Sequence, residues 1–201
     1  MGIRIHISGR LLESLESLNF QNPYWHCHEV VVYFGTMPND CYNYLEAPEG
    51  DVSLISDYFS TAKRAYSSLP EVFLDFEKIL PMPSELKGTQ APADKPNWYD
   101  WCVENWGTKW NSYDGNVTEN GISFNTAWAP PTPVIAALAK QIDKPLRMLY
   151  DEMGMDFCGE VLAYPDGTYE DNCYSPRSDA PDNLRDDLMI DEEDELDEDY
   201  K

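Results

Sequence analysis

The chain has 201 residues, of which 42% are hydrophobic and 13% aromatic, and its formal net charge is −23 from 37 acidic and 14 basic residues. This length and composition suit one globular domain with a substantial core. Because a surface this negative repels phosphate backbones, the charge argues against direct binding to nucleic acid and favours a basic protein partner.

The chain also lacks the signals of several other classes of protein. It contains no stretch of about 18 apolar residues that could span a membrane, and no secretory signal at its N-terminus. Its five cysteines form no CxxC pair and follow no zinc-binding spacing. We therefore expect a cytoplasmic protein with free thiols, no bound cofactor and no membrane contact.

Residues 1–36 differ from the rest of the chain, and they hold all three histidines. On a strand, His26 and His28 would face the same side and could share a metal ion, but no second pair of ligands accompanies them. We interpret this segment as an N-terminal extension that is either poorly ordered or adds the strand Val30–Phe34 to the sheet. With no histidine after His28, no histidine-based triad can form in the remainder.

A regular pattern begins at Met37, which we take as the start of the main domain. Asp51 is a good N-cap, and the apolar residues after it step by three and four, as on one face of a helix. Alternating residues from Val72 then indicate a strand. The expected elements are a strand over 41–47, a helix over 51–66, a strand over 72–80 and a loop over 81–93.

Five of the six tryptophans lie between residues 98 and 128, and we expect most of them to be core residues. A helix opens at Asp94-Lys95-Pro96 and ends at Gly107, where glycine favours a stop. Ile122, Phe124, Thr126 and Trp128 alternate with smaller residues, which predicts a strand with Trp128 in the core. The expected later elements are a helix after Pro133, strands over 146–151 and 157–164, and a hairpin return over 168–173.

This order of strands and helices predicts an α+β, ferredoxin-like sandwich over residues 37–175, with a mostly antiparallel sheet and helices on one face. Residues 176–201 hold 12 acidic and 3 basic side chains and few apolar ones. Because such a segment cannot bury enough apolar surface, we predict a disordered acidic tail.

Several blocks of the domain resemble the YubB-like ferredoxin-like family of phage and plasmid proteins. The opening Met37–Asn43 is similar to the start of that family, and Glu104–Asn111, with the sequence ENWGTKWN, is similar to its central signature. Phe124–Pro131 and Glu152–Gly159 resemble its later blocks. The resemblance covers about residues 37–174. It implies a ferredoxin-like fold and a mobile-element origin in a bacterial host cell, and it carries no activity.

The central signature supplies the first candidate binding residues, Asn105, Trp106, Lys109 and Trp110. In one interpretation Lys109 and Asn105 form a polar cluster in an aromatic pocket, where Lys109 makes a cation–π contact. In the other, the block is structural: the helix ends at Gly107 and the two tryptophans plug the sheet. The acidic tail adds the candidate binding residues Asp191, Glu192, Glu193, Asp194 and Glu195.

The alternative to a binding protein is a metal-dependent hydrolase of mobile-element metabolism. Asp151, Glu152, Asp156 and Glu160 lie close together in sequence, and four carboxylates could hold Mg²⁺. No other catalytic motif is present. A ferredoxin-like sheet with aromatic residues could also stack RNA bases, but the net charge argues against that interpretation.

We therefore expect a non-enzymatic protein that binds and inhibits a host or defence protein with a basic surface. One form of this function is nucleic-acid mimicry, in which ordered carboxylates occupy a groove that normally holds DNA or RNA. The sequence does not indicate an oligomeric state.

Overall fold

The structure is a computed structural model, and it describes residues 39–63 and 70–190. The N-terminal extension with His26 and His28, and the tail residues Asp191–Glu195, lie outside the described residues. Predictions that fall on those segments therefore stay predictions.

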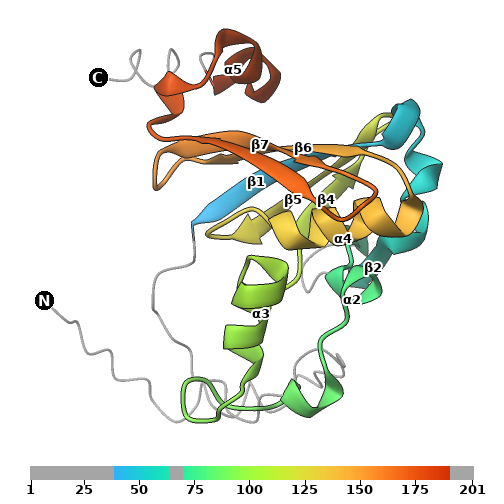
Figure 1. The fold of residues 1–201 in the computed structure, drawn as a ribbon, viewed down its shortest axis with the longest axis vertical. Coiled ribbons are helices and arrows are strands. Elements are labelled where there is room, and N and C mark those ends of the chain that lie inside the picture. Colours follow the sequence, from blue (N-terminus) through green and yellow to red (C-terminus); the bar gives the residue numbers. More distant parts are fainter. Residues whose placement is uncertain (1–38, 64–69, 191–201) are drawn as a thin grey trace, which may run out of the picture. The chain divides into compact units, whose positions relative to one another are not determined.

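Eight strands form one sheet in the order β2-β3-β4-β5-β1-β6-β7-β8 (Figure 1). Every neighbouring pair is antiparallel. The strands are β1 (Asp40–Glu46), β2 (Phe59–Lys63), β3 (Pro70–Leu74), β4 (Tyr113–Val117), β5 (Gly121–Ala127), β6 (Leu146–Glu152), β7 (Phe157–Ala163) and β8 (Tyr169–Tyr174).

Helices of the described residues connect these strands or pack on the sheet. The α-helices are α2 (Phe76–Ile79), α3 (Trp98–Trp106), α4 (Thr132–Ile142) and α5 (Asp182–Leu188). The 3-10 helices are η1 (Pro48–Gly50), η2 (Val52–Leu54), η3 (Ser56–Tyr58), η4 (Ser84–Leu86) and η5 (Arg177–Asp179). Within the described part of the chain, no helix is both long enough and apolar enough to cross a lipid bilayer.

The centre of the sheet has ferredoxin-like topology, as predicted. Strand β1, helix α3, hairpin β4–β5, helix α4 and strand β6 follow one another along the chain, and their strands lie in the order β4-β5-β1-β6. This is the β-α-β-β-α-β arrangement. The hairpin β2–β3 extends the sheet beyond β4, and β7–β8 extend it beyond β6.

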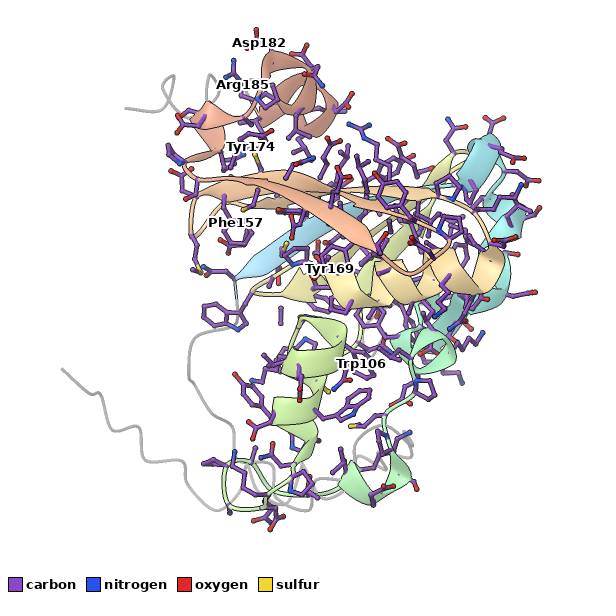
Figure 2. All side chains as sticks on the ribbon, viewed as in Figure 1. Trp106, Phe157, Tyr169, Tyr174, Asp182 and Arg185 are labelled. Atoms are coloured by element: carbon purple, nitrogen blue, oxygen red, sulfur yellow. The ribbon has the colours of Figure 1, made fainter. Side chains whose placement is uncertain are left out.

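The main core lies between the sheet and the helices α3 and α4 that cover one of its faces (Figure 1). Ile122 and Phe124 of β5 point into it, as their alternation predicted. A series of edge-to-face ring contacts runs from the helix to the sheet, joining Trp101, Trp106, Phe76 and Phe124 in that order. Trp106 is 3% exposed, so the core prediction is confirmed for this tryptophan (Figure 2).

The second face of the sheet carries α5, which corrects two predictions. Helices lie on both faces, not on one, and residues 176–190 are part of the fold rather than of a disordered tail (Figure 1). The contacts are apolar: Leu184 and Ile190 are buried against Leu149 of β6 and Cys158 of β7. These few apolar residues face the sheet while their acidic neighbours remain outside, so average composition gave the wrong prediction.

The segment between β1 and α3 also differs from its prediction. Instead of a helix over 51–66, the chain forms η2 and η3 and then β2. Asp51 does act as an N-cap, because its Oδ1 accepts the Ser53 backbone N–H at 3.0 Å. The predicted strand over 72–80 stops at Leu74, since the Asp75 carboxylate caps the short helix α2 by accepting the Glu77 N–H at 3.1 Å.

Trp128 is not a core residue, contrary to its prediction. It follows the last residue of β5, has a left-handed φ of 74°, and is 41% exposed. The backbone leaves the strand conformation after Ala127. The alternation of buried side chains that begins at Ile122 therefore ends before Trp128.

Candidate interaction face

The signature block is built mainly from structural contacts. Gly107 ends α3 with φ 78°, and a Cβ at this position would lie 3.0 Å from both Pro130 O and Pro133 Cδ. Thr108 is buried and donates its hydroxyl to Ala127 O at 2.8 Å. Glycine is therefore needed for both the turn and the close approach of the next segment.

The candidate residues of this block do not form the expected polar cluster. Trp106 donates its indole N–H to Leu80 O at 2.8 Å, and Asn105 donates its side-chain amide to Trp101 O at 2.9 Å within α3. Lys109 Nζ lies 4.3 Å from the centre of the Trp110 ring, which is the predicted cation–π contact. No described contact links Asn105 to Lys109. The partly exposed Lys109–Trp110 pair is the part of the block that a partner could touch.

The four carboxylates of the hydrolase alternative are not brought together. Asp151 and Glu152 are consecutive on β6 and point to opposite faces of the sheet. Asp151 binds Arg177, and Glu160 binds Arg147 at 2.9 Å. No group of three or more histidine, cysteine, aspartate or glutamate side chains among the described residues could hold a metal ion.

Glu152 is a buried carboxylate with only one of its two oxygens hydrogen-bonded among the described residues. It is fully buried; its Oε2 accepts the Met155 backbone N–H and so closes the turn between β6 and β7. Its Oε1 has no hydrogen-bond partner among the described residues. Continuing the register of β1 with β6 by one pair places Cys41 beside it. Burial strongly raises the pKa of the Cys41 thiol, so this neighbour is a poor nucleophile at neutral pH.

The second face of the sheet is only partly covered by the described residues. Helix α5 packs on β6 and β7, whereas β1, β4 and β5 carry exposed or half-buried polar and aromatic side chains. These residues, which we call the tyrosine face, are Asp40, Tyr42, Tyr44, Tyr113, Ser123 and Asn125. The sequence pattern did not predict this face, since it indicated no strand at β4. The alternation of Asp40, Tyr42 and Tyr44 in β1 was the signal that could have indicated it.

The register places Tyr42 and Tyr113 on either side of Asn125. Asn125 pairs with Tyr42 on one side and with Tyr113 on the other. The Tyr113 hydroxyl donates to Asp40 Oδ1 at 2.5 Å. Burial, and then this hydrogen bond, raise the pKa of Tyr113, and burial also raises the pKa of Tyr42, so both phenols are neutral donors at physiological pH.

Two arginines are bound on the same face of the sheet. Arg177 makes a two-point ion pair with Asp151, with Nε–Oδ1 at 2.7 Å and Nη2–Oδ2 at 3.0 Å. Arg147 is bound by three carboxylates, those of Glu46 at 2.7 Å, Glu160 at 2.9 Å and Asp187 at 3.0 Å. Burial lowers the pKa of Arg147, but the three carboxylates outweigh it and the net shift is upward.

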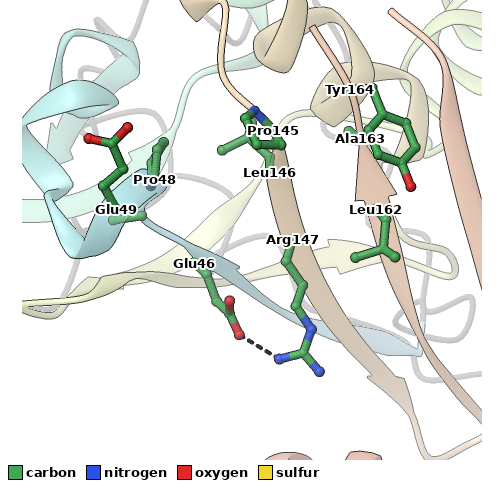
Figure 3. Close-up of a pocket in the computed structure, with 10 residues that line it drawn as sticks. Glu46, Pro48, Glu49, Pro145, Leu146, Arg147, Leu162, Ala163 and Tyr164 are labelled. Atoms are coloured by element: carbon green, nitrogen blue, oxygen red, sulfur yellow. Dashed lines mark hydrogen bonds and ion pairs between the residues drawn. The ribbon is translucent and has the colours of Figure 1, made fainter.

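Arg147 also borders a shallow pocket of about 270 Å³ at the start of β6 (Figure 3). Pro48, Pro145 and Tyr164 contribute to its walls. The guanidinium is turned to Glu46, as the dashed contact in Figure 3 shows. Since three carboxylates already bind it, this pocket offers no unpaired cation to an anionic ligand.

Several other basic side chains also form ion pairs within the molecule. Lys87 binds Glu77 at 3.1 Å, Lys144 binds Glu49 at 2.6 Å, and Arg185 binds Asp182 at 2.9 Å. These pairs neutralise the cations and leave the excess acids exposed. The described surface therefore carries more exposed carboxylates than exposed cations.

Comparison with known proteins supports the fold and leaves the function open. Residues 105–197 match a family model described as a ferredoxin-like domain in Api92-like protein. No curated protein matches the chain. Among solved structures, the crystal structure of protein api92 from Yersinia pseudotuberculosis is similar at 16% identity, with a TM-score of 0.42, over 51% of this chain and 40% of that one. The chain thus spans less than half of that relative.

The family match begins near the end of α3 and continues past α5. It agrees with the predicted ferredoxin-like fold, whereas the narrower resemblance to YubB-like phage and plasmid proteins stays a prediction. Residues 105–197 are thus similar to the ferredoxin-like domain in Api92-like protein.

Proposed function

We propose that the protein is a non-enzymatic interaction protein that binds a basic macromolecular partner through its acidic surface. The observation that supports this most directly is the internal pairing of the cations. Arg147 alone engages three carboxylates, and Lys87, Lys144 and Arg185 each bind an acid of the same molecule. The excess negative charge therefore faces outward, where it steers association with a positive surface.

The resemblance to phage and plasmid proteins directs this proposal to a host or defence protein. We propose that the partner has a basic groove for DNA or RNA, and that the protein inhibits it by occupying that groove. Complementary charges on the two partners speed their association and fix their relative orientation more than they increase affinity. The tyrosine face supplies the contact area that charge alone does not.

Affinity capture tests this proposal. The full chain is immobilised, exposed to nuclease-treated bacterial lysate at 0.1 M NaCl, and eluted either with double-stranded DNA or with salt. We expect a basic, nucleic-acid-binding protein that both eluents release, because screening shortens from about 10 Å at 0.1 M to about 3 Å at 1 M. The eluted proteins are identified by mass spectrometry.

A matrix coated with polyglutamate is the control for bulk acidity. A protein that binds the polyglutamate equally well does not recognise the fold. A captured complex that resists both salt and DNA would end the mimicry proposal, and the contact would then be sought at the Lys109–Trp110 pair.

A further inference from the structure

The carboxylates on the second face of the sheet follow a pattern. Glu46, Asp151 and Glu160 each hold an arginine of this chain against the sheet. Asp40 belongs to the same face, because residues two apart along β1 point to the same side. It is exposed, and no described cation pairs with it.

The Arg177 site indicates what this face can bind. Asp151, which takes both guanidinium contacts, pairs with Tyr42 in the register of β1 and β6. The bound arginine and its carboxylate are almost completely buried, with 9% and 10% of their side chains exposed. Of the two contacts, the one from Nη2 is a hydrogen bond and the one from Nε is an ion-pair contact. A carboxylate contacted at two points favours arginine over lysine.

Asp40, two residues before Tyr42 on the same side of β1, is oriented for a similar contact. The Tyr113 hydroxyl holds Asp40 Oδ1 at 2.5 Å and thereby orients the carboxylate. No described residue donates a hydrogen bond to Oδ2. Tyr42 is 43% exposed, and Tyr42 and Tyr113 lie on either side of Asn125 on the same face of the sheet as Asp40.

We propose that the tyrosine face docks an arginine-rich segment of a basic protein, with one guanidinium bound by Asp40 between Tyr42 and Tyr113. This inference rests on the proposed function and names the position that carries it. The carboxylate supplies the charge-assisted hydrogen bonds, and the rings supply cation–π stacking. A second copy of this chain or a nucleic acid does not fit, since both would bring negative charge to a negative face.

Fluorescence anisotropy with two labelled probes tests the proposal on the full-length chain. The probes are an octa-arginine and an octa-lysine peptide, each titrated in 0.15 M NaCl. We expect the arginine peptide to bind more tightly. The Asp40→Asn variant should weaken arginine binding about fivefold while affecting the lysine peptide less, because a point charge gains little from the planar site.

The control variant is Glu104→Gln. Glu104 is an exposed acid of α3, which packs on the opposite face of the sheet, and its replacement removes the same charge. It should change the affinity less than about twofold, because a distant exposed charge is screened. Asn at position 40 still accepts the Tyr113 hydroxyl bond, so the fold should be retained, and thermal unfolding checks this. Tyr42→Leu, which removes the ring together with the hydroxyl contact to Ser123 and keeps the Asp40 carboxylate, should weaken arginine binding about threefold.

The outcomes separate this inference from the proposed function. If neither peptide binds even in 0.01 M NaCl, the proposal of a basic partner fails as a whole. If the peptides bind but Asp40→Asn behaves like Glu104→Gln, the acidic surface binds without this site and the inference is overturned. Equal affinity for the two peptides would also overturn it.

Discussion

At the scale of single residues, Trp128 is the position where the pattern and the structure diverge. Its backbone N–H donates to Asn39 O at 3.0 Å and ties the end of β5 to the start of β1. The left-handed φ of 74° is rare for a bulky side chain and is unfavourable for any L-residue. A period-two pattern describes only residues inside the strand, so it could not predict where the backbone turns.

Trp128 should therefore be replaceable by glycine. We expect Trp128→Gly to be about 1 kcal/mol more stable than Trp128→Ala. Glycine adopts a positive φ without strain, whereas alanine at this position remains strained. Trp106→Ala, which empties a buried site, should lose about 3–5 kcal/mol. Urea unfolding of the three variants measures these differences. A loss for Trp128→Ala as large as that for Trp106→Ala would contradict the exposed position.

Tyr150 should make the fold sensitive to high pH. Burial, and then its hydrogen bond to Asp171 at 2.6 Å, raise its pKa above the ordinary value of 10.0. The unfolded chain loses this proton near pH 10 whereas the folded chain keeps it. Above that pH the unfolded state binds fewer protons, so the free energy of unfolding falls as pH rises.

The Tyr150→Phe variant isolates this effect. At pH 8 it should be about 1–2 kcal/mol less stable than the natural chain, because the hydrogen bond to Asp171 is lost. Between pH 9.5 and 11 its stability should fall less steeply, and the difference between the two proteins should shrink. Urea titrations across this range measure both slopes, with the exposed Tyr169→Phe as the control substitution. If the stabilities of the natural chain and of Tyr150→Phe fell in parallel between pH 9.5 and 11, the raised pKa of Tyr150 would be contradicted.

At the scale of elements, the parts that were predicted correctly carry their own local signals. Helix α3 ends at Gly107, as predicted. Its start was predicted wrongly: it begins after Asn97, whose side chain accepts the Asp100 N–H at 3.0 Å, and not at Asp94-Lys95-Pro96. Strands β5, β6 and β7 show their burial pattern within seven residues each. Strand β2 was missed because its apolar residues also fit the three-and-four spacing of a helix face. The break at Asp75 depends on the local cap of Glu77 and also on a distant partner. Asn111 donates to Asp75 Oδ1 at 2.9 Å from 36 residues away.

The candidate site was predicted less well than the fold. In the signature block, Asn105, Trp106 and Thr108 each donate a hydrogen bond to a backbone carbonyl. The tyrosine face needs β4 beside β5 and the register of β1, which sequence periodicity does not provide. Helix α5 was missed for a related reason: seven residues are too short to be stable alone, and its stability comes from packing on the sheet.

Two shortened chains test the role of α5. A chain ending at Ile190 should unfold at nearly the temperature of the full chain, because it keeps η5, α5 and their contacts. A chain ending at Ser175 exposes Leu149 and leaves Asp151 without Arg177. Breaking a buried ion pair from one side costs about 3–5 kcal/mol, so this chain should be strongly destabilised or insoluble. Equal melting temperatures for the two chains would restore the prediction of a disordered segment over 176–190.

At the scale of the whole molecule, the charge acts on folding and on binding in opposite directions. A net charge of −23 repels itself in the compact state, and it also attracts a cationic partner. Salt screens both effects. The internal ion pairs respond less, since contacts of about 3 Å are shorter than the screening length at any ordinary ionic strength.

Raising NaCl from 0.01 M to 0.15 M should therefore stabilise the fold while it weakens binding to the arginine peptide. The screening length falls from about 30 Å to about 8 Å over this range, which removes most of the repulsion between distant carboxylates and little of the attraction within pairs. Residues 191–201 contribute 8 acidic and 1 basic side chain, so the chain ending at Ile190 should gain less from the same salt. Calorimetric melting temperatures of both chains measure the effect. A full-length protein that melts at a lower temperature in 0.15 M NaCl would mean that the ion pairs of Arg147 and Arg177, rather than self-repulsion, control its salt dependence.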